Sequence, residues 1–500
     1  MPQTKPTSEQ VTFLAAGTGA SQRTALEKLR DVVSVKDFGA VGDGVADDTV
    51  AFQAALNSGA YVHVFVPAGT YRITSTINIT QQNTLSGPEG GTQNMQHAFI
   101  THDAASSGSL FNVTTNVAGV CIKNLTVTGG NGSFCITSSN SYVRYEYIKM
   151  SFYNGGGIRL LSSGVGSSSS KVMYCQWVGP ASATAYTGFE IDVNGGDVWL
   201  HGCTAINGAI GINVIQGQTI ILDGCSVNKQ SRYAGLSSAT QFNTAGIKLS
   251  GAGLKQAISI HRCYIEACDN GVYVDSCESL SIEDNLFDDG GVAGVVGAWT
   301  AYGNSSINLT ASNAKNVTVK NNRIIALSNG DSGNTFYAVY INNATNVVLL
   351  NNLIETTGSY NAQFYVTSPS GAYVLANTRQ QSGSNQQSDY NPNNALRDLN
   401  PALSAWLPIT FQNSWVDGGS AAYNKDHIGF VVMRGQITSG TIPATAFTLP
   451  TGYRPVVQQS FPVVSNGALG IVTVATNGQV IIASGSNVEI QLATITFQTA

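Results

Sequence analysis

Four acidic residues in the middle of the chain have types and spacings suited to acid–base chemistry. Glu266 and Asp288 lie 22 residues apart, with Asp269 and Asp289 close beside them. Two carboxyl groups about 5–9.5 Å apart are the usual apparatus of glycoside hydrolysis: one protonates the leaving oxygen, and the other attacks the sugar or activates water. Close like charges raise one pKa and so supply the acid. We expect Glu266 and Asp288 to be the catalytic pair, with Asp289 or Asp269 as alternative partners; the other interpretation is a run of surface acids.

A second cluster could transfer protons along one column of the fold. Asp223, His261 and Glu283 occupy the same position of successive repeats, with His201 before them and Lys320 after them. An acid–histidine–acid arrangement can act as an acid/base relay because histidine titrates near neutral pH. The same alternation also suits polar side chains that face solvent or a second subunit, and both interpretations stay open.

We expect two insertions to form the walls of a groove around the acidic pair. Eighteen residues separate Val227 from Gly246, and another eighteen separate Phe287 from Ser306. Loops mounted on a rigid scaffold commonly carry function, and these insertions contain aromatic and basic residues that suit a sugar chain. The expected substrate contacts are Arg232, Tyr233, Arg262, Trp299 and Tyr302.

One repeating sequence pattern must position all of these residues. It is clearest in VWLHGCTAI (198–206), IILDGCSV (220–227), ISIHRCYIE (258–266), LSIEDNLFD (280–288), VTVKNNRII (317–325) and VVLLNNLIE (347–355). Apolar residues at period two predict β-strands. A repeat of roughly 20–50 residues predicts an array whose units bury their apolar faces on their neighbours. The sequence therefore predicts a parallel β-helix in which equivalent positions lie about 4.8 Å apart.

One corner of this repeat is filled by small or amide side chains. Buried thiols pack well there, and stacked Asn side chains can hydrogen-bond along a ladder. The residues are Cys203, Cys225, Cys263, Asn285, Asn322, Asn352 and Asn377. We expect the eight cysteines to be reduced, and the Cys and His spacings predict neither a metal site nor a cofactor.

The composition argues against several classes of partner. Only 11% of the residues are charged, and the net charge is −5 without a basic run, so no nucleic-acid partner is expected. No apolar stretch of about 18 residues is present, so no membrane span is expected. The first ten residues, MPQTKPTSEQ, lack a charged-then-apolar leader, so no secretion signal is expected.

Changes in polarity and in the alternation of apolar residues predict four parts of the chain. Residues 1–33 form a polar arm with a short helix at 22–30, and residues 34–380 form the β-helix, closed by a capping helix at about 47–57. Residues 381–400 are a polar linker. Residues 401–500 alternate around turns such as Asn477-Gly478 and predict an antiparallel, β-sandwich-like domain. That domain could clamp the fold, hold a trimer together or contact carbohydrate.

The start of the predicted β-helix carries a family resemblance. The segments DFGAVGDGVADDT (37–49) and VPAGTYRI (66–73) resemble the pectate-lyase-like superfamily of right-handed β-helices, and with the polar arm the chain is similar to bacteriophage tailspike proteins. The resemblance implies a homotrimeric virion protein, made in the host cytoplasm and acting at the bacterial surface. It also implies a tail or baseplate adaptor bound through the arm, and a bacterial surface polysaccharide as ligand and substrate.

Three functions are compatible with these features. The first is an endoglycosidase that depolymerises the polysaccharide by hydrolysis, which the paired acids favour. The second is a polysaccharide lyase, which needs a base and a neutralising cation such as Arg262, Lys248, Lys229 or Arg232. The third is an adhesin that binds glycan without cleaving it. New reducing ends, an unsaturated product, or binding alone would distinguish them.

Overall fold

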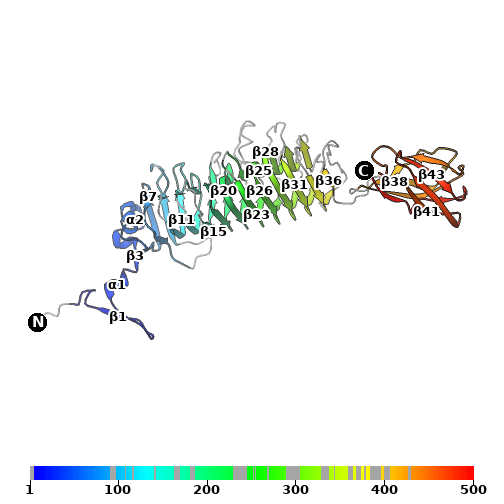
Figure 1. The fold of residues 1–500 in the computed structure, drawn as a ribbon. Coiled ribbons are helices and arrows are strands. Elements are labelled where there is room, and N and C mark those ends of the chain that lie inside the picture. Colours follow the sequence, from blue (N-terminus) through cyan, green and yellow to red (C-terminus); the bar gives the residue numbers. More distant parts are fainter. Residues whose placement is uncertain are drawn as a thin grey trace. The chain divides into compact units, whose positions relative to one another are not determined.

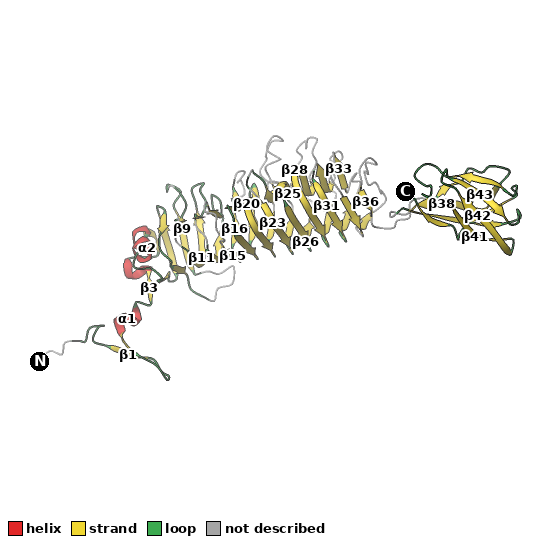
Figure 2. Ribbon diagram, in the orientation of Figure 1, coloured by secondary structure: helices red, strands yellow, loops and turns green. Residues whose placement is uncertain are grey.

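The computed structural model describes residues 5–499, except 90–96, 107, 115–117, 140–141, 163–168, 181–185, 229–244, 252, 254, 267, 269, 289–304, 328–336, 343, 358–363, 368–372, 377–378, 383–395, 399–405 and 426–428. The chain divides into two compact units, Met1–Ala395 and Leu396–Ala500. In the first unit, strands stack one after another along a solenoid (Figure 1), and helices lie near its N-terminal end (Figure 2). None of the described helices has the length and apolarity needed to cross a membrane.

A small hairpin and a short helix precede the solenoid. β1 (Thr12–Leu14) pairs antiparallel with β2 (Gln22–Thr24), and α1 (Ala25–Leu29) follows. The Thr24 hydroxyl accepts a hydrogen bond from the Glu27 amide, and the Glu27 carboxylate accepts one from the Thr24 amide. This capping box fixes the start of the helix. The helix predicted at 22–30 is wrong at its start, because residues 22–24 pair as a strand.

The solenoid begins with β3 (Val32–Ser34), the 3-10 helix η1 (Val35–Phe38), β4 (Asp43–Asp47) and α2 (Thr49–Leu56). Helix α2 lies inside the range 47–57 in which the sequence predicts a helix, and it buries Phe52, whose ring packs edge-on against Tyr71 at 5.3 Å. The acids of this segment hold the backbone: Asp48 accepts a 2.6 Å hydrogen bond from the Val41 amide, and Asp43 and Asp47 each accept bonds from amides of their own turns. These acids therefore stabilise the backbone at the start of the fold, although Asp48, the residue before helix α2, makes no side-chain cap bond to that helix.

Each complete coil contributes strands to three parallel lines, and every strand pairs with its counterparts in the coils before and after it. The first line contains β5 (His63–Phe65), β8 (Thr84–Ser86), β11 (Cys121–Gly129), β13 (Arg144–Met150), β15 (Ser169–Met173), β18 (Asp197–His201), β20 (Ile210–Asp223), β23 (Lys255–His261), β26 (Ser279–Glu283), β28 (Ser305–Lys320), β31 (Thr345–Leu350) and β34 (Tyr373–Ala376).

The second line contains β6 (Gly69–Ile73), β9 (Ala98–His102), the later parts of β11 and β13, β16 (Gln176–Val178), β19 (Thr204–Ile206), β21 (Ser226–Asn228), β24 (Tyr264–Glu266), β27 (Leu286–Asp288), β29 (Arg323–Leu327), β32 (Leu353–Thr357) and β35 (Arg379–Ser382). The third contains β7 (Ile77–Ile79), β10 (Phe111–Val113), β12 (Ile136–Ser138), β14 (Ile158–Ser162), β17 (Thr187–Val193), β22 (Ala245–Leu249), β25 (Asn270–Cys277), β30 (Tyr337–Asn342), β33 (Phe364–Thr367) and the first parts of β20 and β28.

The inner side of the corner between the first and second lines is a ladder of buried side chains. Cys203 donates through its thiol to the Val172 carbonyl at 3.3 Å, and each of the eight cysteines is free. Higher in the solenoid, Asn285 Nδ2 donates to Asn322 Oδ1 at 2.9 Å, and Asn322 Nδ2 donates to Asn352 Oδ1 at 3.0 Å. The predicted Asn ladder is confirmed for these three residues, whereas Asn377 lies outside the described residues.

The outer side of the same corner requires a left-handed backbone. From the β11 coil to the β32 coil, the corner residue has a positive φ in every coil; these residues are Asn124, Tyr147, Tyr174, Gly202, Gly224, Arg262, Asp284, Asn321 and Asn351. Gly, Asn and Asp adopt this conformation at the lowest cost, whereas bulky residues in it are outliers. The sequence-level repeat is therefore also a repeat of backbone geometry.

From residue 407 onward, the described part of the second unit forms two antiparallel sheets. One contains β37 (Leu407–Pro408), β38 (Val416–Lys425), β39 (Phe430–Thr438), β44 (Ile490–Gln491) and β45 (Thr496–Gln498); the other contains β40 (Ala444–Thr448), β41 (Gln459–Ser465), β42 (Ala468–Val474) and β43 (Gln479–Ser484). Their inner faces share one apolar core that includes Trp415, Phe447 and Phe497. The predicted all-β class, a right-handed parallel β-helix with a C-terminal antiparallel β-sandwich-like part, is confirmed.

Candidate functional site

Glu266 and Asp288 occupy paired positions on two adjacent strands. β24 pairs parallel with β27, with Glu266 opposite Asp288. The preceding residues, Ile265 and Phe287, are each 1% exposed and therefore point into the core. Because side chains alternate along a strand, both carboxylates lie on the outer face, one strand spacing of about 4.8 Å apart at the backbone. The stacking that the repeat predicts is present.

Tyr264 stands on the same outer face as Glu266, two residues before it, and its hydroxyl donates a long 3.4 Å hydrogen bond to Asp288 Oδ2. Burial, and then the negative charges of Glu266 and Asp288, raise the pKa of the Tyr264 phenol, so it remains a proton donor at neutral pH. Tyr264 was not among the site residues predicted from the sequence. The period-two alternation that placed Glu266 outward could have found it.

Several predicted site residues lie outside the described residues. These are Asp269 and Asp289 of the acidic group, and Arg232, Tyr233, Trp299 and Tyr302 of the expected substrate contacts, so their roles stay predictions. All of them except Asp269 belong to the segments 229–244 and 289–304, which directly follow β21 and β27 in the chain. Those two strands lie on either side of β24 in the sheet. Among the expected substrate contacts, Arg262 is described; it stands at the corner of the same coil as Glu266 and is 69% exposed.

The second cluster stands in one column of the first line. The observed register pairs His201 with Asp223, Asp223 with His261, His261 with Glu283, and Glu283 with Lys320. This is the order that the repeat predicts. Whether the column relays protons stays a prediction.

Each acid of this column has basic partners. Arg262 donates to both oxygens of Asp223, at 2.8 and 2.6 Å, and His201 Nδ1 lies 2.9 Å from Asp223 Oδ2. Lys320 Nζ lies 2.8 Å from Glu283 Oε2. Burial raises the pKa of Asp223, but the hydrogen bonds from Arg262 and His201 outweigh it and lower the pKa overall. For Glu283, bonds from Lys320 and Ser281 likewise outweigh burial and lower its pKa, so both acids are held as anions.

His201 extends this network to a residue that the sequence analysis did not identify. Its Nε2 lies 3.0 Å from the Tyr174 hydroxyl, and the two rings meet edge to face at 5.2 Å. His261, in contrast, hydrogen-bonds to Ser259 in its own strand. Within the described part of the chain, no group of three or more His, Cys, Asp or Glu side chains could hold a metal ion.

Comparison with known proteins gives one family. The model of the family described as rhamnogalacturonase A/epimerase, pectate lyase-like, matches residues 32–296, which is more than half of the chain. Among curated proteins, the chain is similar to the preneck appendage protein of Bacillus phage PZA, at 35% identity over 101 residues, covering 20% of this chain and 11% of that protein. It is also similar to the capsule-specific depolymerase 1 of Klebsiella phage K5-2, at 30% identity over 128 residues, covering 21% of this chain and 16% of that protein. The chain thus matches only a small part of these relatives' lengths.

Among solved structures, the chain is similar to the tailspike protein of E. coli bacteriophage HK620 in complex with a pentasaccharide. The TM-score is 0.57 at 13% sequence identity, and the match covers 97% of each chain. At this identity the similarity concerns the fold.

Proposed function

Because the chain belongs to the rhamnogalacturonase A/epimerase, pectate lyase-like family, we propose that it is a phage tailspike that binds and depolymerises a bacterial surface polysaccharide. We propose that cleavage is endo-glycosidic hydrolysis at Glu266 and Asp288. The observation that carries this proposal is the in-register stacking of these two outward carboxylates, with the Tyr264 hydroxyl against one of them. The capsule-specific phage depolymerase among the relatives and the sugar-bound tailspike of similar fold support the choice of a polysaccharide.

The spacing of the acids suggests the course of the reaction. Carboxyl groups about 5–5.5 Å apart perform double displacement with retention of configuration. The backbones of Glu266 and Asp288 are one strand spacing of about 4.8 Å apart, and we propose that this pair works by double displacement. We assign Asp288 as the nucleophile, because the hydrogen bond from Tyr264 stabilises its anion. Asp288 attacks the anomeric carbon while Glu266 donates its proton to the leaving oxygen. Glu266 then removes a proton from water, which displaces Asp288 and releases the new reducing end.

Product analysis tests this proposal directly. Capsular and lipopolysaccharide preparations from a panel of bacterial strains are digested, and fragments are followed by reducing-end assay and mass spectrometry. Hydrolysis adds one water per cleavage and creates no ultraviolet-absorbing double bond. Glu266→Gln should stop cleavage and keep binding; undiminished cleavage by this variant would contradict the assignment.

A polysaccharide lyase is the second candidate, favoured by one observation. The Arg262 guanidinium, exposed at the corner of the Glu266 coil, could neutralise a uronate carboxylate and so acidify the neighbouring C–H bond. An unsaturated, ultraviolet-absorbing product would select this reaction. Binding without any product from the strain panel would select the third alternative, a glycan-binding adhesin.

Assembly and location are part of the same proposal. We propose a homotrimer carried on the virion, with residues 1–33 bound to a phage tail or baseplate adaptor, because the relatives include phage appendage proteins. The arm has apolar side chains that it does not bury: Phe13, Leu14 and Leu29 are 42%, 62% and 69% exposed. Deleting residues 1–33 should abolish incorporation into virions and leave glycan cleavage intact.

A further inference from the structure

The left-handed corner carries three residues that its backbone does not favour. Most coils place Asn, Asp or Gly at this position, but Tyr147, Tyr174 and Arg262 adopt φ values of 53°, 53° and 51°. A side chain of this size in the left-handed region costs roughly 1–2 kcal/mol relative to the right-handed one. Because strained residues of this kind cluster at functional sites, these three positions deserve a physical explanation.

The three residues are linked across successive coils. The rings of Tyr147 and Tyr174 stack with centroids 5.1 Å apart and planes 14° from parallel. At the next corner stands Gly202, where a Cβ would lie 2.6 Å from Tyr174 Cδ1, so the glycine makes room for the ring. Tyr174 then contacts His201, which binds Asp223, which in turn binds Arg262. From the Tyr147 coil to the Arg262 coil there are four strand spacings, or about 19 Å.

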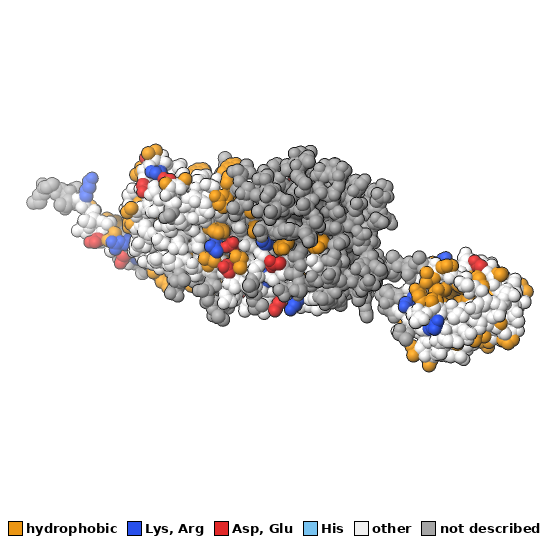
Figure 3. Space-filling view, turned by 90° about the horizontal axis from the view of Figure 1, so that it is seen from above, with side chains coloured by type: hydrophobic (Ala, Val, Ile, Leu, Met, Phe, Trp, Pro, Cys, Tyr) orange, Lys and Arg blue, Asp and Glu red, His pale blue; other side chains and the backbone are white. Residues whose placement is uncertain are grey.

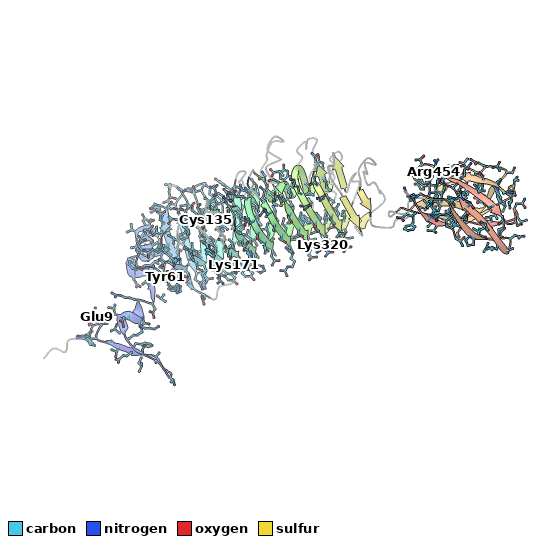
Figure 4. All side chains as sticks on the ribbon, in the orientation of Figure 1. Glu9, Tyr61, Cys135, Lys171, Lys320 and Arg454 are labelled. Carbon is cyan, nitrogen blue, oxygen red and sulfur yellow. The ribbon has the colours of Figure 1, made fainter. Side chains whose placement is uncertain are left out.

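Next to this chain of contacts, the outer face of the first strand line carries an exposed aromatic ring. Trp199 is 42% exposed and Tyr147 is 39% exposed. Lys171 stands opposite Trp199 in the adjacent strand, with its Nζ 4.4 Å from the centroid of a Trp199 ring. Lys171 projects from the same edge of the solenoid as Lys320, which belongs to the same strand line (Figure 4).

In two ion pairs on this surface, the basic side chain is more exposed than its acidic partner. Arg144 is 59% exposed, whereas Glu146, its ion-pair partner, is 11% exposed. Arg262 is 69% exposed, whereas its partner Asp223 is 17% exposed. In each of these two ion pairs a ligand approaching from solvent therefore meets the cation before the acid, on a protein whose net charge is −5. On the face of the molecule in Figure 3, the described part of the solenoid is mostly uncharged, and acidic and basic side chains lie close to one another.

We propose that Tyr147, Tyr174, Trp199, Lys171, Arg144 and Arg262, together called the corner strip, form a binding surface for an acidic polysaccharide. The aromatic faces stack against sugar rings, and the three cations pair with carboxylates along the polymer. A protein interface would favour a core depleted of charge, which does not fit aromatic rings framed by exposed cations. The strip occupies the corner and the first strand line, whereas Glu266 and Asp288 stand on the second. This inference rests on the proposed function and specifies its substrate class as a uronate-bearing polymer.

Affinity electrophoresis with named probes tests the strip. The full-length Glu266→Gln protein, which should leave polymers intact, is run in native gels that contain alginate, polygalacturonate or uncharged dextran. We expect retardation by at least one acidic polymer, weaker at higher salt, and none by dextran. Retardation of a negatively charged protein by a polyanion requires a local cationic site. Absence of retardation by both acidic polymers would overturn the proposal.

Substitutions then locate the binding. In the Glu266→Gln background, Trp199→Ala and Lys171→Glu should each weaken binding at least ten-fold. Phe99→Ala is the matched control: Phe99 is 43% exposed but lies in β9 of the second line, and its loss should change nothing. Tyr147→Asn places at the corner a residue that the same turn already holds at Asn124, Asn321 and Asn351. It should weaken binding without lowering Tm; a lower Tm with unchanged binding would make Tyr147 structural.

The outcomes separate this inference from the catalytic assignment. Unchanged binding in the Trp199 and Lys171 variants overturns the strip, even if Glu266→Gln abolishes cleavage. If Glu266→Gln still cleaves while the strip variants lose binding, the catalytic assignment of Glu266 and Asp288 is wrong and the corner strip is supported as the binding surface. If the strip substitutions change the mass of the assembly in solution, the strip is a contact between copies, and the proposal is overturned.

Discussion

Two neighbouring columns of the solenoid carry acidic residues in different surroundings. In the first strand line, Asp223 binds Arg262 and His201, and Glu283 binds Lys320. In the second line, Glu266 stands directly beside a second acid, Asp288, with a tyrosine hydroxyl between the strands. The first arrangement stabilises anions through ion pairs, whereas the second places two carboxyl groups next to each other and to a hydroxyl donor. Two different positions of one repeat therefore hold ion-paired acids in one column and neighbouring acids in the other.

The largest effect should come from removing one of the paired acids. Asp288→Asn should reduce cleavage by about 10²–10⁴-fold, the range for loss of one positioned catalytic group, because the proposed nucleophile is removed. Glu355→Gln is the matched control: Glu355 lies two coils further along the same column, but it is bound by Arg323 at 2.8 Å. Initial rates of reducing-end formation measure both variants. Equal losses of cleavage in both variants would contradict the distinction between the Glu266–Asp288 pair and an acid held in an ion pair.

The next largest effect should be a loss of stability on substitution in the Asn ladder, at the inner side of the corner. Asn322→Ala removes the side chain that connects Asn285 to Asn352, and each buried polar group left unpaired costs about 1–3 kcal/mol. Asn321→Gly, one residue earlier on the exposed outer side, should change the free energy of unfolding by only a few tenths, about 0.5 kcal/mol or less. Urea denaturation measures both. A smaller loss for Asn322→Ala than for Asn321→Gly would contradict the ladder's role.

A moderate effect should follow from substitution of Tyr264, which stands beside the acidic pair. Tyr264→Phe removes the hydroxyl that donates to Asp288, and we expect about a ten-fold loss of kcat, or about 1.4 kcal/mol. Initial rates of reducing-end formation over a range of substrate concentrations measure kcat. An unchanged kcat would exclude Tyr264 from the site.

The smallest effect should come from the ion-paired column and should depend on pH. The pKa values of Asp223 and Glu283 lie below the ordinary values of 3.8 and 4.5. Their contribution to stability is therefore complete above those values and is lost as the pH falls through the lower, folded-state pKa values. Asp223→Asn should flatten the decline of Tm below about pH 4. The same slope in wild type and variant would show that the column does not stabilise the fold.

Much of the geometry was predictable from the repeat. Apolar positions at period two set which side chains point inward, and equivalent letters of successive repeats set the register. This is why Glu266 was correctly placed beside Asp288, and Asn285 beside Asn322. The hairpin strand at residues 22–24 was missed because its partner, β1, lies ten residues away in a segment without alternation. Tyr264 and Tyr174 were missed because a phenol hydroxyl carries no charge at neutral pH and so does not belong to the pattern of acids and bases that marks the two clusters.

The sequence by itself determined the repeat, the strand periodicity and therefore the columns, because a parallel β-helix must stack equivalent positions of successive coils. Only the tertiary structure decided which charges meet. Arg262 could have turned toward Glu266 in its own coil, yet it binds Asp223, 39 residues earlier. Tyr174, at the same left-handed corner, contacts His201 of the following coil instead, and a one-dimensional pattern contains no side-chain direction.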